Sequence, residues 1–147
     1  MTRQHAVLTA IWIASLLVAL GIVEAYIALR TEEGYRVLLA EDRDECLKPI
    51  LTLYASYIGG ILAFWFTKPF RPPKSDRAAA VRLWIALVCT VVFNVAVLYL
   101  IGQKHLSLDL GLDTVADDVA FARTVGLWMS FLVAPVNLFY FGAKAPS

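Results

Sequence analysis

One carboxylate, Glu24, lies inside a long apolar run, where an ionised side chain is costly. Such a residue faces a partner, the interior of a helix bundle or a water-filled cavity, or it stays protonated. In any of these settings it could bind and release a cation or a proton. Glu24 also lies about 8 Å from the end of its run at Leu29, so its carboxylate could instead reach interfacial water or Arg30.

Three further polar residues, Ser56, Asn94 and Ser130, fall at a similar depth in three other apolar runs. When the runs are aligned by their ends, all four polar residues lie within about one helical turn of one another. This alignment predicts a buried polar layer or the wall of an ion pathway, with Asn94 as the hydrogen-bond partner of Glu24. The alternative is coincidence, with Ser56 and Ser130 bonded to carbonyl groups of their own helices.

The four apolar runs are each long enough to cross a membrane. The chain of 147 residues is 60% hydrophobic and 17% charged, whereas soluble domains are about 45–50% apolar and about 25% charged. A bilayer core of about 30 Å needs roughly 20 helical residues. We therefore predict a single all-α integral membrane domain over residues 1–147. It would be a four-helix bundle with transmembrane helices at about 6–30, 48–67, 78–102 and 115–142.

The distribution of charge predicts the orientation of these helices. One side of the membrane would hold both termini and segment 68–82, with seven Lys and Arg against one carboxylate. The other side would hold segments 30–48 and 102–123, with six Lys and Arg against ten carboxylates. Because Lys and Arg divide almost evenly, the dense basic segment decides the orientation by the positive-inside rule. We expect cytoplasmic N- and C-termini, in the inner membrane of a bacterium.

The segments between the predicted helices suggest contact surfaces. On the cytoplasmic side, five basic residues suit contact with anionic lipid headgroups or docking of an acidic cytoplasmic protein. On the outer side, residues 35–44 predict a short interfacial helix, and residues 106–112 alternate like an extended segment. The basic residues are Lys68, Arg71, Lys74, Arg77 and Arg82.

Small residues recur at every fourth position in three of the predicted helices. Small side chains allow close helix approach in a membrane, where lipid supplies no hydrophobic drive for association. One such stripe suffices for packing within a protomer, so the surplus favours a homo-oligomer, although all three could serve the protomer alone. The stripes are Ala6, Ala10 and Ala14; Ala55, Gly59 and Ala63; and Ala122, Gly126, Ser130 and Ala134.

Pro135 interrupts the fourth predicted helix. A proline within a helix frees the carbonyl four residues earlier, here that of Phe131, and kinks are common at such positions. The kink could act as the hinge of a gate, or it could be a bend that neighbouring groups satisfy.

Other reactive side chains do not form a recognisable active site. His5 and His105 belong to opposite sides of the membrane, and Cys46 and Cys89 differ in depth, which predicts two thiols rather than a disulfide. The aspartates of segment 109–118 lack the spacing of an EF-hand and indicate a solvated acidic surface. We therefore expect no enzymatic activity, no cofactor, no metal site and no nucleic-acid partner.

Three functions fit these features. The first is a homo-oligomeric pore or ion channel with cation preference, because acidic outer segments would concentrate cations near Glu24. The alternative is a non-transporting anchor, sensor or assembly subunit that binds a partner through segment 68–82. Four spans with one glutamate in the first also resemble the small multidrug resistance family, although that family's motif residues are absent from positions 21–25 and its loops are shorter. This resemblance implies a second alternative, a small proton-coupled transporter.

Overall fold

The described part of the chain is entirely helical apart from one turn residue, Met129. The computed structural model describes residues 3–28, 43–67, 77–107 and 115–141. These ranges form α1 (Arg3–Ala28), α2 (Arg43–Thr67), α3 (Arg77–Ser107), α4 (Val115–Trp128) and α5 (Ser130–Phe141). The all-helical class predicted from the sequence is confirmed for these residues.

Three of the helices are long and apolar enough to cross a membrane. Their candidate spans are Gln4–Ala28 in α1, Arg43–Phe64 in α2 and Ala80–Gln103 in α3. The pair α4 and α5 meets the same test only when taken together, because the helices have only 14 and 12 residues. The two are bent by 60° at the break between them. The described residues therefore contain three membrane-crossing candidates, or four if the bent pair forms one span.

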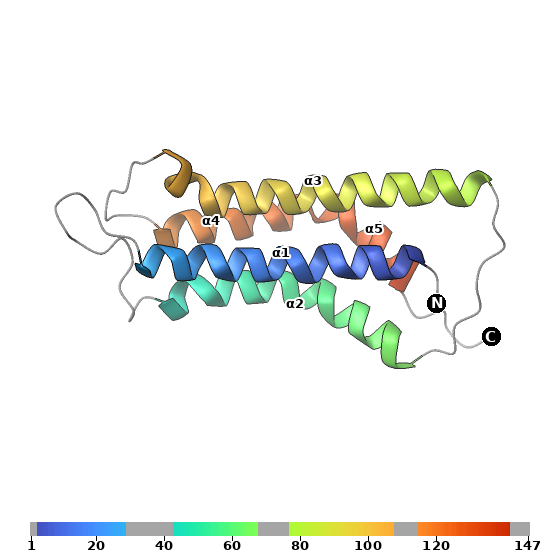
Figure 1. Ribbon diagram of the computed structural model, residues 1–147, viewed down its shortest axis with the longest axis horizontal. Coiled ribbons are helices and arrows are strands. Elements are labelled where there is room, and N and C mark those ends of the chain that lie inside the picture. Colours follow the sequence, from blue (N-terminus) through green and yellow to red (C-terminus); the bar gives the residue numbers. More distant parts are fainter. Residues whose placement is uncertain (1–2, 29–42, 68–76, 108–114, 142–147) are drawn as a thin grey trace.

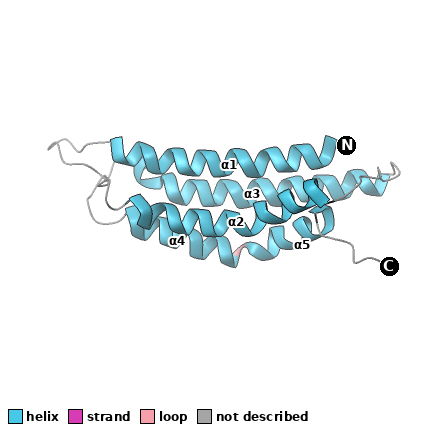
Figure 2. Ribbon diagram, turned by 90° about the horizontal axis from the view of Figure 1, so that it is seen from below, coloured by secondary structure: helices cyan, strands magenta, loops and turns pink. Residues whose placement is uncertain are grey.

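The helices lie side by side: α2 runs antiparallel to α1, α3 to α2, and the bent pair of α4 and α5 to α3 (Figures 1 and 2). Helix α1 contacts α2 and α3, and the pair α4 and α5 contacts both α2 and α3 on the other side. The starts of α1 and α3 and the ends of α2 and α5 share one end of the molecule, here called the proximal end (Figure 1). The opposite end, with the starts of α2 and α4, is called the distal end.

Close packing of α4 against its neighbours depends on Gly126. A Cβ atom added there would lie 2.8 Å from Cδ2 of Leu53 on α2 and 3.4 Å from Cγ2 of Val97 on α3. The glycine therefore lets the backbone of α4 approach both helices, as the small-residue pattern of the fourth predicted helix suggests.

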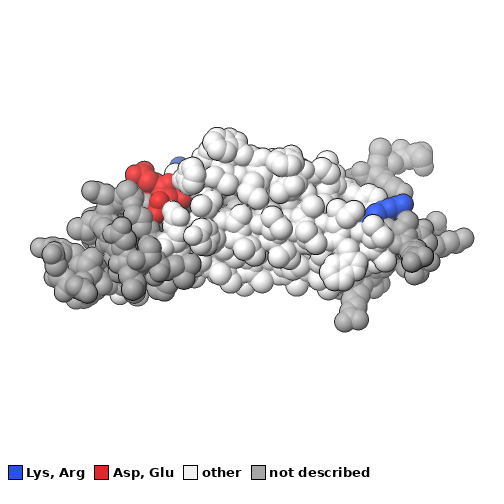
Figure 3. Space-filling view, turned by 90° about the horizontal axis from the view of Figure 1, so that it is seen from above, with Lys and Arg blue, Asp and Glu red and all other residues white. Residues whose placement is uncertain are grey.

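The outer surface between the two ends is apolar. Figure 3 shows an uncharged middle region, with acidic side chains at the distal end and a basic side chain at the proximal end. Large aromatic side chains are exposed here, including Trp84, Trp128 and Phe131 at about 70% each. Such an extended apolar exterior would aggregate in water and suits a lipid environment.

Several element boundaries differ from the sequence-based expectations. Helix α3 continues to Ser107, about one turn beyond the predicted end at 102, so residues 106 and 107 are helical rather than extended. Helix α2 begins at Arg43, five residues before the predicted start. The predictions used the ends of apolar runs, whereas helical hydrogen bonding continues through polar residues outside the membrane core. Most of the predicted interfacial helix 35–44, and residues 108–114, lie outside the described residues.

Candidate functional site

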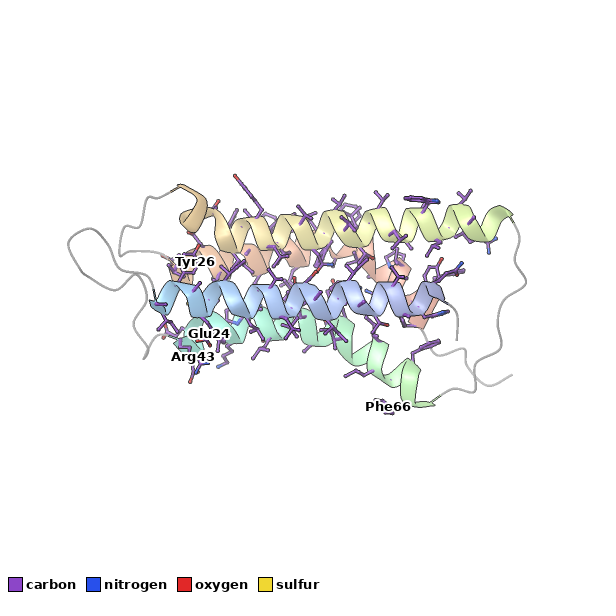
Figure 4. The ribbon with its side chains drawn as sticks, viewed as in Figure 1. Glu24, Tyr26, Arg43 and Phe66 are labelled. Atoms are coloured by element: carbon purple, nitrogen blue, oxygen red, sulfur yellow. The ribbon has the colours of Figure 1, made fainter. Side chains whose placement is uncertain are left out.

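Glu24 lies at the distal end and is paired with Arg43 at the start of α2 (Figure 4). The arginine Nε donates a hydrogen bond of 2.8 Å to Oε1 of the glutamate, and an Nη atom donates a second to the same oxygen. Both side chains are about half exposed. The structure thus gives Glu24 an accessible ionic partner and does not bring it together with Asn94.

The other residues of the predicted polar layer separate into different environments. Ser56 is exposed and donates a hydrogen bond of 2.9 Å to the carbonyl of Leu53, the bond to its own helix that was the alternative interpretation. Ser130 is half-buried and shares a side-chain hydrogen bond with Tyr57. Asn94 is almost completely buried, at 2% exposure. The four residues therefore do not form one layer.

A cluster of rings fills the middle of the molecule instead. Trp12 of α1 is stacked on Tyr57 of α2, with ring centroids 4.6 Å apart. The ring of Tyr54 meets Trp12 in an edge-to-face arrangement, with centroids 5.9 Å apart, and the ring of Phe93 is tilted against Trp12 at 5.5 Å. We call Trp12, Tyr54, Tyr57 and Phe93 the central aromatic cluster.

Two buried polar residues of α3 adjoin this cluster. Thr90 lies one turn before Phe93 and Asn94 directly follows it, so all three belong to the same part of α3. The amide Nδ2 of Asn94 donates a hydrogen bond of 2.8 Å to the backbone carbonyl of Thr90. The side-chain oxygen of Asn94 and the hydroxyl of Thr90 take no part in this bond.

Four polar atoms in this region have no hydrogen-bond partner among the described residues. They are Nε1 of Trp12, the hydroxyl of Tyr54, Oγ1 of Thr90 and Oδ1 of Asn94. Their side chains come from three helices and are between 0% and 2% exposed. A buried polar atom without a partner costs about 1–3 kcal/mol. Four such atoms in and beside one cluster make this region the candidate site for binding a polar molecule.

This site lies near the midpoints of the candidate spans. Tyr54 is at the middle of Arg43–Phe64, and Thr90 and Asn94 flank the middle of Ala80–Gln103. Trp12 is about one turn from the middle of Gln4–Ala28. Asn94 belongs to the polar layer expected from the sequence, whereas Trp12, Tyr54 and Thr90 were not assigned to it. Sequence alignment by run ends missed Trp12 and Tyr54 because their polar atoms belong to largely apolar side chains.

The break between α4 and α5 occurs beside the same cluster. At the break, the amide of Met129 still donates to the carbonyl of Val125 at 2.8 Å, but the amide of Leu132 donates to Met129 at 3.0 Å, a tighter i to i−3 bond. Ser130, which bonds Tyr57, is the first residue of α5. The bend predicted near Phe131 is therefore present, centred about half a turn earlier.

A second aromatic group, not predicted from the sequence, lies at the proximal end. The imidazole of His5 is stacked on Phe64 of α2, with ring centroids 4.8 Å apart. The rings of Tyr140 and Phe141 of α5 are in edge-to-face contact with it, at centroid distances of 5.7 Å and 5.8 Å. The imidazole also shares a hydrogen bond with the backbone of Tyr140. We call His5, Phe64, Tyr140 and Phe141 the proximal aromatic cluster. The repeated aromatic residues at the ends of the apolar runs were the sequence signal for it.

The residues expected to contact lipid or a cytoplasmic partner are only partly described. The guanidinium of Arg82 is exposed at the proximal end and lies 5.9 Å from the ring centroid of Phe139. Arg77 begins α3. The basic residues Lys68, Arg71 and Lys74 lie outside the described residues.

The small-residue stripes divide between inside and outside. Gly126 is buried against α2 and α3, and Ala134 is half-buried. Ala55, Gly59 and Ala63 of α2 are exposed, and nothing lies within 4 Å of a Cβ added at Gly59. The stripe on α4 therefore serves packing within the protomer, whereas the stripe on α2 faces outward.

Comparison with known proteins adds no assignment. No family model, curated protein or solved structure matches this chain. Among the described residues, no group of three or more His, Cys, Asp or Glu side chains is placed to hold a metal ion.

Proposed function

We propose that this chain is an integral membrane protein that moves a small solute across the bilayer through a site at its centre. The observation that carries this proposal is the coincidence of two features near the midpoints of the spans. One is the group of four buried polar atoms without partners, and the other is the helix break at Met129.

This combination is typical of membrane transport sites. An unpaired polar group is expensive in a lipid-embedded interior, and non-helical backbone is tolerated there only where it is buried in protein or lines a cavity. Many secondary transporters place their substrate site near the midplane beside such a discontinuous helix. Here Ser130 at the break is bonded to Tyr57, which is stacked on Trp12. Movement of α5 about the break would therefore alter the central aromatic cluster directly.

The proximal aromatic cluster supplies a barrier in this scheme. It joins α1, α2 and α5 at the proximal end, where the second half of α2 also diverges from α1 (Figure 1). Because α5 carries Tyr140 and Phe141, a change in the bend at Met129 would move two of the rings that surround His5. We propose that this motion opens the site to the proximal side.

The proposed membrane arrangement is a four-helix transmembrane bundle in which α4 and α5 form one broken span. Both termini would be cytoplasmic, in a bacterial inner membrane. The support is the basic segment 68–82, which joins α2 and α3 at the proximal end, together with the acidic character of the outer segments.

Flux into proteoliposomes tests the proposal. Vesicles containing the purified chain are mixed with a hyperosmotic solution of glycerol, acetamide, rubidium chloride or tetraethylammonium chloride, and re-swelling is followed by stopped-flow light scattering. We expect faster entry of at least one probe than in protein-free vesicles. We also expect slowing by Ser130→Ala, which removes the bond to Tyr57, but not by Ser56→Ala, whose hydroxyl bonds its own helix at the surface. Equal entry of every probe with and without protein would contradict transport.

A homo-oligomeric cation pore is the second candidate, and the outward-facing stripe Ala55, Gly59 and Ala63 favours it. A second copy packed on this face would bury small side chains closely. The half-exposed Glu24–Arg43 pair on the neighbouring helices α1 and α2 would then lie at the distal mouth. Single-channel recording in planar bilayers tests this candidate. We expect cation-selective steps whose selectivity falls in Glu24→Gln and is retained in Asp44→Asn, an exposed carboxylate in the first turn of α2.

If the protein shows neither solute flux nor channel current, the remaining alternative is favoured, a non-transporting anchor, sensor or assembly subunit. In that case neutralising Arg71, Lys74 and Arg77 would disrupt its association with a cytoplasmic partner, while Glu24→Gln would have no effect. Co-purification from membranes, with and without these substitutions, measures that association.

A further inference from the structure

We propose that the central site takes a small uncharged molecule that both donates and accepts hydrogen bonds, such as a small amide, a polyol or water. This inference rests on the proposed transport function and specifies the class of its solute. It depends on which polar groups are present around the central aromatic cluster and on the absence of charge there.

The four unpaired atoms differ in what they require. The indole Nε1 of Trp12 can only donate a hydrogen bond, and Oδ1 of Asn94 can only accept one. The hydroxyls of Tyr54 and Thr90 can do either. An occupant that satisfies all of them must therefore offer at least one acceptor and at least one donor. A quaternary ammonium ion has neither, and a carboxylate or halide anion has no donor.

Charge is lacking in the buried interior of the described residues. The buried polar side chains there are those of His5, Ser15, Thr90 and Asn94, and His5 belongs to the proximal aromatic cluster. One carboxylate oxygen of Asp118 is buried, but in the first turn of α4 at the distal end. Glu24 is also distal and is neutralised by Arg43.

A charged occupant would therefore enter without a counter-charge. Transfer of an unpaired ion into a low-dielectric interior costs several kcal/mol even after relaxation. A neutral molecule avoids this cost and gains hydrogen bonds that the described side chains leave unmade. The balance favours uncharged solutes over ions at this site.

The rings limit the size of the occupant. Trp12 and Tyr54 are fully buried, and the centroids in the central aromatic cluster are 4.6–5.9 Å apart. Rings in direct contact leave little space among them, so the proposed occupant is a molecule with few non-hydrogen atoms. Their faces also offer apolar contact to the carbon atoms of an amide or a polyol.

Two substitutions remove unpaired atoms while nearly conserving volume. Thr90→Val and Tyr54→Phe each delete a buried hydroxyl that has no partner in the described structure. Their matched controls are Thr124→Val, whose exposed hydroxyl bonds the carbonyl of Ala120 at 3.0 Å, and Tyr99→Phe, which is 59% exposed. Thermal unfolding in detergent establishes that each variant is folded before flux is measured.

The test compares uncharged and charged probes in the same proteoliposomes. Glycerol and acetamide report organic solutes, the rate of osmotic shrinkage reports water, and rubidium and tetraethylammonium report cations. We expect protein-dependent flux of an uncharged probe, reduced about threefold to tenfold by Thr90→Val or Tyr54→Phe and unchanged in the controls, which corresponds to the loss of one hydrogen bond. Water flux without organic flux would identify water as the occupant and also support the inference.

Two results overturn the inference and differ in what they say of transport. Flux of cations alone would leave the chain a transporter but would show that its path is not this neutral site. No flux of any probe would remove the proposed function together with the inference. Uncharged flux that survives both Thr90→Val and Tyr54→Phe unchanged would also reject the central site as the route.

Discussion

At the scale of single residues, hydrogen-bond partners distinguish polar side chains that look alike in the sequence. Glu24 and Asn94 both interrupt apolar runs, yet one is half-exposed beside Arg43 and the other is buried beside Thr90. The exposed pair is expected to contribute little stability, because solvent-accessible ion pairs are worth about 0–1 kcal/mol. The buried amide is the more consequential residue, since its Oδ1 atom has no partner within the described ranges.

One hydrogen bond between distant residues gives a prediction at this scale. The hydroxyl of Tyr26 on α1 donates a bond of 3.0 Å to the carbonyl of Ile101 on α3, and Tyr26 is fully buried (labelled in Figure 4). Tyr26→Phe should lower the free energy of unfolding by about 0.5–1.5 kcal/mol, because a buried carbonyl loses its side-chain donor. Unfolding in mixed detergent micelles measures the change. Tyr99→Phe serves as control, and equal stability of the two variants would argue against the bond.

At the scale of elements, the same residue type has opposite roles on different helices. Gly126 lets α4 approach α2 and α3, whereas Gly59 on α2 faces open space. Neither position could be assigned to the inside or the outside of the protomer from its spacing alone. Both belong to four-residue repeats of small residues that look equivalent in the sequence.

These two glycines give a prediction that separates folding from assembly. Gly126→Leu should destabilise the protomer by a few kcal/mol, because its Cβ alone would lie 2.8 Å from the buried Leu53 and a leucine adds three more carbon atoms there. Gly59→Leu should leave the protomer folded, because nothing lies within 4 Å of the new Cβ. Thermal unfolding in detergent compares the two variants.

Assembly is measured on the same proteins. If the outward face of α2 joins two copies, Gly59→Leu should convert the oligomer to monomer in detergent, as seen by light scattering coupled to size-exclusion chromatography. Gly21→Leu on α1, which also meets nothing within 4 Å, is the matched control. A Gly59→Leu protein with an unchanged mass would place any oligomer interface elsewhere.

At the scale of the whole molecule, the length of the apolar helices and the absence of charge on the middle surface of Figure 3 both suit a membrane-spanning arrangement. Three helices are apolar for long enough to cross a bilayer, and the broken pair α4 and α5 completes an even number of crossings if it is one span. An even number places both ends of the chain on the same side. The uncharged middle surface seen in Figure 3 has the character that such an arrangement requires.

Site-directed labelling tests the predicted topology, with both termini and segment 68–82 on the cytoplasmic side. In a background with Cys46→Ser and Cys89→Ser, a cysteine introduced as Ser75→Cys should react with a membrane-impermeant maleimide only after the cells are opened. A cysteine introduced as Asp113→Cys should react in intact cells. The physical reason is the retention of the dense basic segment on the cytoplasmic side. Reaction of both positions from the same side would require an even number of crossings between them and would contradict a single crossing by α3.

The sequence by itself determined the helical class, the approximate positions of the long apolar helices and the bend between α4 and α5. These properties are local, because the length of an apolar run and the effect of a proline depend on neighbours along the chain. Only the tertiary structure decided which groups meet. The partner of Glu24 is 19 residues away on α2, and that of Tyr26 is 75 residues away on α3. Such pairs depend on how each helix is rotated about its axis and how deeply its neighbour lies beside it. For that reason the polar atoms of Trp12, Tyr54, Thr90 and Asn94 became recognisable as one candidate site only when three helices were packed together.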